Sequence, residues 1–204
     1  MNKSTTEGWV SAYLNRRFSR PLAKLFARTP VTPNQMSFLS FIAAIGSLSL
    51  FVTGHNVWAG LVAQASSVLD GVDGDLARIK NMKSSFGGFF DAILDRYSDF
   101  AIIGGLTFWA LQFEARFDNI VVVAAGLAAM VGSFMISYSR ARAEASFGKP
   151  FLGPIGFLAS RDARLLIVMI GSIVGHGTLT LVFLGAMTNL VVVSRVFAAR
   201  KGLE

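Results

Sequence analysis

The sequence predicts an all-α protein, a polytopic membrane helical bundle of six transmembrane helices with an N-terminal amphipathic surface helix. Of its 204 residues, 53% are hydrophobic and only 15% are charged, a composition typical of membrane proteins. Apolar stretches also recur along the chain, and several approach the roughly 20 residues that a helix needs to span a bilayer. Together these observations favour a membrane bundle over a soluble domain.

Six hydrophobic segments predict the six helices. We expect them at 33–53, 57–80, 85–113, 119–138, 164–175 and 178–198. The second is extended at its end, and the third at its start, by Asp-rich stretches that a hydropathy window undervalues. Thr32-Pro33-Asn34 marks the start of the first, because threonine can cap a helix and proline suits its first turn. Short loops at 54–57, 114–118 and 175–177 predict a compact bundle.

Residues 1–30 form the predicted N-terminal amphipathic juxtamembrane segment, and 31–204 form the membrane domain, since no repeat or linker divides the chain. Basic residues alternate with apolar ones in this segment, and the apolar spacing from Val10 to Leu25 is 4, 4, 4 and 3. Such a stripe predicts a helix lying on the membrane surface, bent or divided at Pro21. The alternative is a frayed basic tail.

The positive charge is placed asymmetrically. The net charge is +7, but nearly all of the 19 Lys and Arg residues fall at one set of predicted helix ends. This pattern predicts a multi-pass cell-membrane protein whose termini and candidate site are cytoplasmic, with the lipid bilayer and no nucleic acid as partner. Cysteine is absent, which excludes disulfides and thiolate metal sites.

Acidic residues crowd into the second and third hydrophobic segments. Six of the chain's 12 acids lie there: Asp70, Asp73, Asp75, Asp91, Asp95 and Asp99. Each ionised carboxylate in a membrane helix is disfavoured by about 2.5 kcal/mol or more, so cations must compensate. The spacings 70/73 and 91/95 put each pair on one helix face, and facing pairs would suit Mg²⁺, Mn²⁺ or Ca²⁺. We expect Asp75 and Asp99 to form structural ion pairs with Arg78 and Arg96.

Small residues surround these acids. They are Gly71, Gly74 and Ala77 on one helix and Gly87, Gly88 and Ala92 on the other. Such residues let a ligand approach the backbone closely, although ordinary membrane helix packing uses them too. Arg78 adds a fixed cation that can hold a phosphate oxygen.

The pattern Asp70-x2-Asp73-Gly74-x2-Ala77-Arg78, followed by Gly87-x3-Asp91-x3-Asp95, resembles in full the motif of the CDP-alcohol phosphotransferase family. The resemblance implies transfer of a substituted phosphate from a CDP-alcohol donor to a hydroxyl, with release of CMP. It implies two Mg²⁺ or Mn²⁺ ions on Asp70, Asp73, Asp91 and Asp95, with Asp95 also as the catalytic base. It further implies CDP binding by Asp70, Asp73, Gly74, Ala77, Arg78 and Gly87, and a homodimer.

A second polar cluster predicts the acceptor site. Its arginines lie on the predicted cytoplasmic side, and each alone could be a lipid headgroup anchor. Together they are similar to the inositol-phosphate-accepting branch of the family. That likeness implies that Arg140, Arg161 and Arg195 bind a small polar, phosphate-bearing acceptor, and that Arg164 is the next candidate for this role. Glycerol 3-phosphate remains an alternative acceptor, and the donor is either a CDP-lipid or CDP-inositol.

Two rival functions fit the sequence less well. A membrane prenyltransferase also binds Mg²⁺-pyrophosphate on aspartates, but it should have more helices and lacks this Gly-Ala-Arg spacing. An ion transporter should place its acids near the middle of the membrane, whereas these lie toward the basic helix ends.

Overall fold

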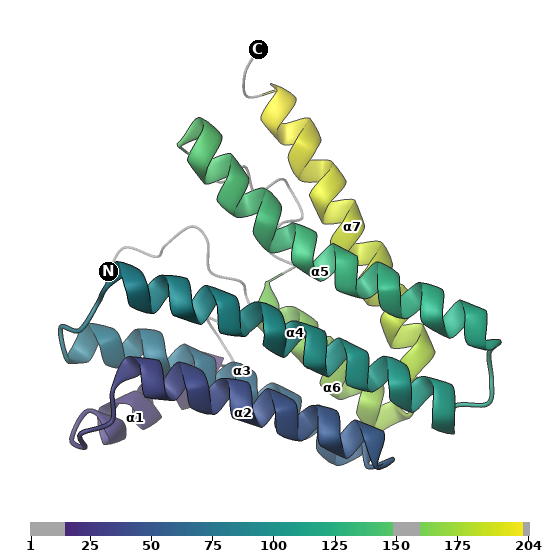
Figure 1. The fold of residues 1–204 in the computed structure, drawn as a ribbon, viewed down its shortest axis with the longest axis horizontal. Helices are drawn as coiled ribbons and strands as arrows, with labels where there is room; N and C mark the ends of the chain where they lie inside the picture. Colours follow the sequence, from purple (N-terminus) through teal and green to yellow (C-terminus); the bar gives the residue numbers. More distant parts are fainter. Residues whose placement is uncertain (1–14, 149–159, 202–204) are drawn as a thin grey trace.

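The structure is a computed structural model that describes residues 15–148 and 160–201. These ranges contain seven helices, which confirms the predicted all-α class (Figure 1). The helices are α1 (Arg16–Phe26), α2 (Pro33–Val52), α3 (Asn56–Ile79), α4 (Ser85–Phe113), α5 (Asn119–Phe147), α6 (Arg161–Val174) and α7 (Gly177–Lys201).

Helices α2 to α7 match the six predicted segments, with one clear difference in length. The prediction ended the fourth segment at residue 138, where the apolar run stops, but α5 continues to Phe147. The extra residues are mostly Ala, Arg, Glu and Ser, and the first three favour helix without requiring burial. The helix therefore outlasts its hydrophobic stretch.

Length and composition qualify three of the described helices as membrane spans, namely α2, α5 and α7. Three short connections, α2 to α3, α4 to α5 and α6 to α7, lie at the same end of the bundle (Figure 1, right). The aspartates lie toward the other end of α3 and α4, which is also where α1 packs against α3. Helices α5 and α7 pack along each other, and their later turns project beyond the rest.

Helix α1 confirms a helical element within the predicted N-terminal segment, of which residues 1–14 lie outside the described ranges. Of the two effects predicted for Pro21, division of the helix is wrong, because Pro21 lies inside one helix. Proline leaves the carbonyl of Arg17 without its helical donor, but Arg17 is exposed, so water can bond that oxygen. Ser19 and Ala23 are buried on the inner face of α1.

Candidate functional site

Three aspartates from two helices converge at one end of the bundle. Asp70 lies on α3, and Asp91 and Asp95 lie one turn apart on α4. One carboxylate oxygen from each lies within 4.8 Å of the other two. These oxygens are close enough to share one hard divalent cation. The aspartate spacing predicted two facing pairs, 70/73 and 91/95, and the structure brings three of these four carboxylates together.

The chemistry of this cluster fits a divalent metal ion. Oδ1 of Asp91 is buried and has no hydrogen-bond partner among the described residues. A buried carboxylate oxygen is costly to leave without a partner, and a cation would supply one. Because every donor is a carboxylate oxygen, the site suits Mg²⁺ or Mn²⁺ better than a soft metal.

Asp73 lies outside this group of three. Its carboxylate accepts a hydrogen bond from the hydroxyl of Ser37 on α2, and its side chain is buried. It nevertheless lines the same cavity as Asp91. Asp73 is therefore a lining residue of the cavity next to the cluster, and not a member of the group of three.

Arg161, at the start of α6, reaches into the aspartate cluster. Its Nη1 lies 2.7 Å from Asp70 Oδ1 and 2.9 Å from Asp95 Oδ1, and its side chain is 10% exposed. Two carboxylates from different helices thus share one guanidinium. Since the sequence suggested Arg161 only as an acceptor ligand, its direct contact with the acids is a feature that sequence reasoning missed.

The predicted partner of Asp99 was wrong. Asp99 Oδ2 lies 2.6 Å from Arg164 Nη2, and Asp99 Oδ1 lies 3.5 Å from Arg161 Nε, while Arg96 pairs with Asp95 at 3.2 Å. Helix α6 brings its arginines against a buried carboxylate, so a contact between helices replaces the pair within α4. The other predicted pair is confirmed, because Arg78 Nη1 lies 2.6 Å from Asp75 Oδ1.

A cavity of about 290 Å³ opens beside the cluster, between α2, α3 and α4. Of the residues expected to bind CDP, Asp73, Gly74, Ala77, Arg78 and Gly87 line it, whereas Asp70 lines a smaller cavity next to it. A Cβ built on Gly74 or Gly88 would meet nothing within 4 Å. Both glycines therefore leave open space where a ligand can contact the backbone.

Two helix N-termini border this cavity. Ser84 caps α4 by accepting a hydrogen bond from the amide of Gly87 at 2.9 Å. Thr32 and Gln35 form a capping box at the start of α2, and the next residues, Pro33 and Asn34, line the cavity. The positive ends of the two helix dipoles favour an anion such as pyrophosphate there.

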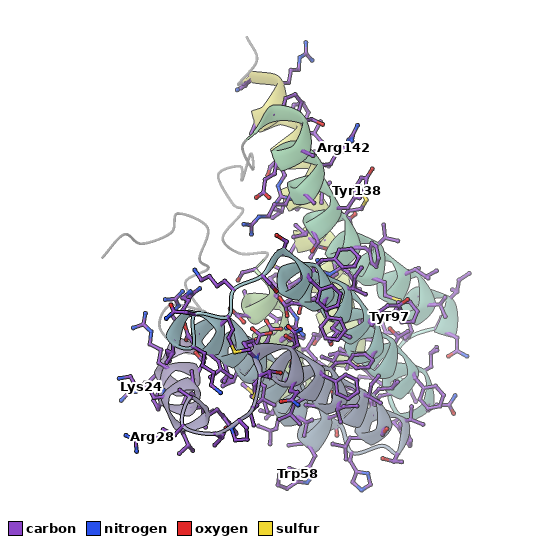
Figure 2. All side chains as sticks on the ribbon, turned by 60° about the vertical axis from the view of Figure 1, so that its left-hand side comes forward. Lys24, Arg28, Trp58, Tyr97, Tyr138 and Arg142 are labelled. Atoms are coloured by element: carbon purple, nitrogen blue, oxygen red, sulfur yellow. The ribbon has the colours of Figure 1, made fainter. Side chains whose placement is uncertain are left out.

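The four arginines expected to bind the acceptor fall into two pairs. Arg161 and Arg164 share Asp99, as described above. Arg195 on α7 donates to the carbonyl of Ile136 at 2.5 Å and to Ser139 Oγ at 2.6 Å, and Arg140 pairs with Glu144 at 3.0 Å. Figure 2 shows the neighbouring Tyr138 and Arg142 on the projecting end of α5. The connecting loop, 147–159, lies almost wholly outside the described residues.

Sequence reasoning also missed Ser37 and Lys83, which line the cavity. Lys83 lies in the turn between α3 and α4, where the charge pattern alone gives it no special role. Ser37 carried a usable signal in its spacing from Ser40 and Ser47, which puts the three serines on one side of α2. All three are buried in the structure. Ser40 and Ser47 donate to backbone carbonyls of α3. Small polar residues at helical spacing thus mark the face of α2 that packs on α3.

Comparison with known proteins finds relatives that match most of this chain. The bifunctional IPC transferase and DIPP synthase of Rubrobacter xylanophilus is 36% identical over 199 residues, 98% of this chain and 44% of that protein. The archaetidylinositol phosphate synthase of Pyrococcus horikoshii is 32% identical over 184 residues, covering 90% of this chain and 91% of that one. The chain thus spans less than half the length of the bifunctional relative.

A solved structure shares the fold. The crystal structure of phosphatidylinositol phosphate synthase from Mycobacterium tuberculosis with CDP-DAG bound superposes with a TM-score of 0.76 at 30% identity, covering 89% of this chain and 93% of that one. The family model for CDP-alcohol phosphatidyltransferase matches residues 30–199, a range that contains every helix contributing to the aspartate cluster and the cavity. The chain belongs to the CDP-alcohol phosphatidyltransferase family.

Proposed function

We propose that this chain is a membrane enzyme that transfers a substituted phosphate group from a CDP-alcohol to a hydroxyl of an inositol phosphate, releasing CMP. The observation that carries the proposal is the junction of a three-aspartate cluster with a glycine-lined cavity bordered by two helix N-termini. A pyrophosphate in that cavity would lie next to the metal-type ligands. The names of the relatives support an inositol-phosphate acceptor.

The donor's pyrophosphate would be held by this chain's own cationic and dipolar groups. Arg78 and the N-terminus of α4 present positive charge to the cavity. Gly74 and Gly87 line it without a side chain that would fill it. Asp70, Asp73, Asp91 and Asp95 would hold two Mg²⁺ or Mn²⁺ ions, a use supported by the manganese-bound M. tuberculosis relative. Bound metal supplies charge neutralisation on the pyrophosphate and on the leaving CMP.

Asp95 is the proposed general base. Its carboxylate lies in the cluster and also beside Arg161, at 2.9 Å. An acceptor whose phosphate is held by Arg161 would therefore bring its hydroxyl near Asp95, which would take the hydroxyl proton as the oxygen attacks phosphorus. Arg164 shares Asp99 with Arg161. Arg164, Arg140 and Arg195 complete the proposed acceptor site.

An apolar cavity of about 300 Å³ supports a lipid-linked donor over CDP-inositol. It lies between α4 and α5 and is lined by Phe100, Ile103 and Leu127 together with Arg96 and Asp99. Because Arg96 pairs with Asp95 and Asp99 pairs with Arg161, these two lining residues adjoin the aspartate cluster. An acyl or isoprenoid chain would find an apolar path there.

We also propose that α2 to α7 all span the cell membrane, with both termini and the site on the cytoplasmic side, and that α1 lies on the membrane surface. Phe18 and Leu25 of α1 are 54% and 61% exposed, as an apolar face in contact with lipid would be. Figure 2 shows Lys24 of α1 and Arg28, in the turn after α1, pointing away from the bundle, where they can meet headgroups. A homodimer is the proposed assembly, testable by light scattering in detergent.

The test is a CMP-release assay on purified protein with Mg²⁺. CDP-diacylglycerol or CDP-inositol is supplied with inositol phosphate or glycerol 3-phosphate in separate reactions. The highest kcat/KM is expected with the CDP-lipid and inositol phosphate, and Asp95→Asn should lower kcat by about 10²- to 10⁴-fold. Asp118→Asn, at the opposite end of the bundle, is the control. No CMP release with any pair of substrates would refute the proposed function.

A further inference from the structure

A buried polar junction ties α1, α3 and α6 together beside the aspartate cluster. Asp162 Oδ1 accepts hydrogen bonds from Asn15 Nδ2 at 2.7 Å and from Ser67 Oγ at 2.6 Å. Asn15 also donates to Ser67 Oγ at 2.9 Å and accepts from Gln64 Nε2 at 2.9 Å. Asn15 and Ser67 are almost wholly buried, at 2% and 0% exposure. Four polar side chains therefore form one network, in which Asn15, Gln64 and Ser67 are buried and Asp162 is partly exposed.

This junction lies next to the aspartate cluster, one residue away along α6 and one helical turn away along α3. On α6, Asp162 directly follows Arg161, and on α3, Ser67 lies one turn before Asp70. The helices are thus joined by two neighbouring cross-links, Ser67 to Asp162 and Asp70 to Arg161. Because consecutive helical side chains point in different directions, Asp162 can face α1 while Arg161 faces the acids.

The first turn of α6 is also tied to α4, because Arg161 lies 2.9 Å from Asp95 and Arg164 lies 2.6 Å from Asp99. Its cap is weak, since the hydrogen bond from the Ala163 amide to Ser160 is 3.4 Å, a long distance for such a bond. The two cross-links to α3 therefore add to the contacts that fix this turn beside the site. Movement of Asp162 would carry Arg161 with it, and a displacement of about 1 Å can matter greatly at a catalytic site.

Helix α1 and the residue just before it pack against the junction. Asn15, just before α1, fills the space between Ser67 and Asp162, and a Cβ built on Gly71 would lie 3.3 Å from Ser19 Cβ. Such close approach shows that α1 is seated tightly on α3 next to the site. The packing of α1 is therefore transmitted to α6 through a side chain, not only through general contact.

We propose that Asp162 and Asn15 are positioning residues that hold Arg161 in place for the acceptor's phosphate, which makes α1 part of the acceptor site's support. The proposal rests on the proposed function, because it needs Arg161 to meet the acceptor. It predicts a defect specific to the acceptor, whereas loss of a merely structural contact would affect both substrates alike.

The experiment compares Asp162→Ala and Asn15→Ala with the conservative variant Asp162→Asn in the CMP-release assay. Asp162→Ala should raise the acceptor KM by about fivefold to twentyfold, while the donor KM changes by less than about twofold. Asn15→Ala should change the acceptor KM in the same direction. Asp162→Asn keeps the accepting Oδ1 and should restore the acceptor KM to near the unsubstituted value.

Glu114→Ala is the matched control. Glu114 is also buried, and its Oε2 accepts from the backbone amide of Thr178 at 2.7 Å and its hydroxyl at 2.9 Å, but it lies at the far end of the bundle. It should lower thermal stability without separating the two KM values. Equal KM changes for donor and acceptor in Asp162→Ala, or no change at all, would overturn the proposal.

Calorimetric binding of inositol phosphate and of CDP with Mg²⁺ separates this proposal from the proposed function. If the unsubstituted protein binds both but releases no CMP, the transfer reaction is refuted, and the positioning role is still tested by the binding constants. Asp162→Ala should then weaken inositol phosphate binding and leave CDP binding unchanged. Absence of inositol phosphate binding by the unsubstituted protein would overturn the positioning role as well.

Discussion

Arg161 Nη1 lies 2.7 Å from Asp70 Oδ1, which joins the first turn of α6 to the second half of α3. The same guanidinium nitrogen reaches Asp95 on α4 at 2.9 Å. A fixed positive charge is therefore built into a cluster of carboxylates that also suits a divalent cation. Part of the mutual repulsion of the acids is balanced by the protein itself, and this balance leads to the first prediction.

Removing Arg161 should make stability more dependent on metal. Arg161→Ala leaves Asp70 and Asp95 without their shared guanidinium, and loss of one partner from a buried ion pair typically costs about 3–5 kcal/mol. The thermal midpoint in detergent should fall, and saturating Mg²⁺ should recover more of it than Mg²⁺ adds to the unsubstituted protein. Thermal unfolding with and without Mg²⁺ measures both shifts. Equal Mg²⁺ shifts in the two proteins would contradict this prediction.

The pairing of Asp99 can be tested by comparing two substitutions. Asp99→Ala removes a carboxylate that lies 2.6 Å from the buried guanidinium of Arg164, so unfolding free energy should fall by about 3 kcal/mol or more. Arg96→Ala should cost less, because Arg96 pairs with Asp95 instead. Adding Arg164→Met to Asp99→Ala should recover part of the loss. A larger loss in Arg96→Ala than in Asp99→Ala would instead favour the pairing expected from the sequence, that of Asp99 with Arg96.

Gly74 should be sensitive to side-chain size because of the ligand rather than because of packing. A Cβ there meets nothing within 4 Å, so Gly74→Leu can be accommodated by the folded protein but fills the cavity. The donor KM should rise by about tenfold or more with little change in thermal midpoint. Gly185→Ala is the contrasting control, since its Cβ would lie 3.0 Å from Ala128 Cβ and should lower stability with the donor KM unchanged. An unaltered donor KM in Gly74→Leu would argue against this cavity as the donor site.

Much of this architecture follows from local pattern. Hydropathy and charge placed α2 to α7, and the spacings 70/73 and 91/95 predicted which aspartates share a helix face, because helical periodicity fixes that relationship. The capping signal at Thr32 likewise marked the start of α2. These features depend on residues close together in the chain.

Contacts that depend on how helices pack were harder to predict. Asp99 has one possible partner on its own helix, Arg96, three residues earlier, and others on α6. Only the tertiary arrangement selects Arg164. The junction of Asn15 with Asp162 joins residues 147 apart in sequence, so no periodicity can reveal it. The end of α5 was missed for a different reason, since hydropathy reports burial in lipid and not helix propensity.

The central claim is that α3 and α4 together hold the metal ions, and Mn²⁺ binding tests it most directly. Electron paramagnetic resonance of free Mn²⁺ would measure affinity in the unsubstituted protein, in Asp70→Ala, in Asp91→Ala and in the control Asp118→Asn. Substitution on either helix should weaken Mn²⁺ binding by about tenfold or more, while the control binds normally. Undiminished Mn²⁺ affinity in both Asp70→Ala and Asp91→Ala would contradict the account.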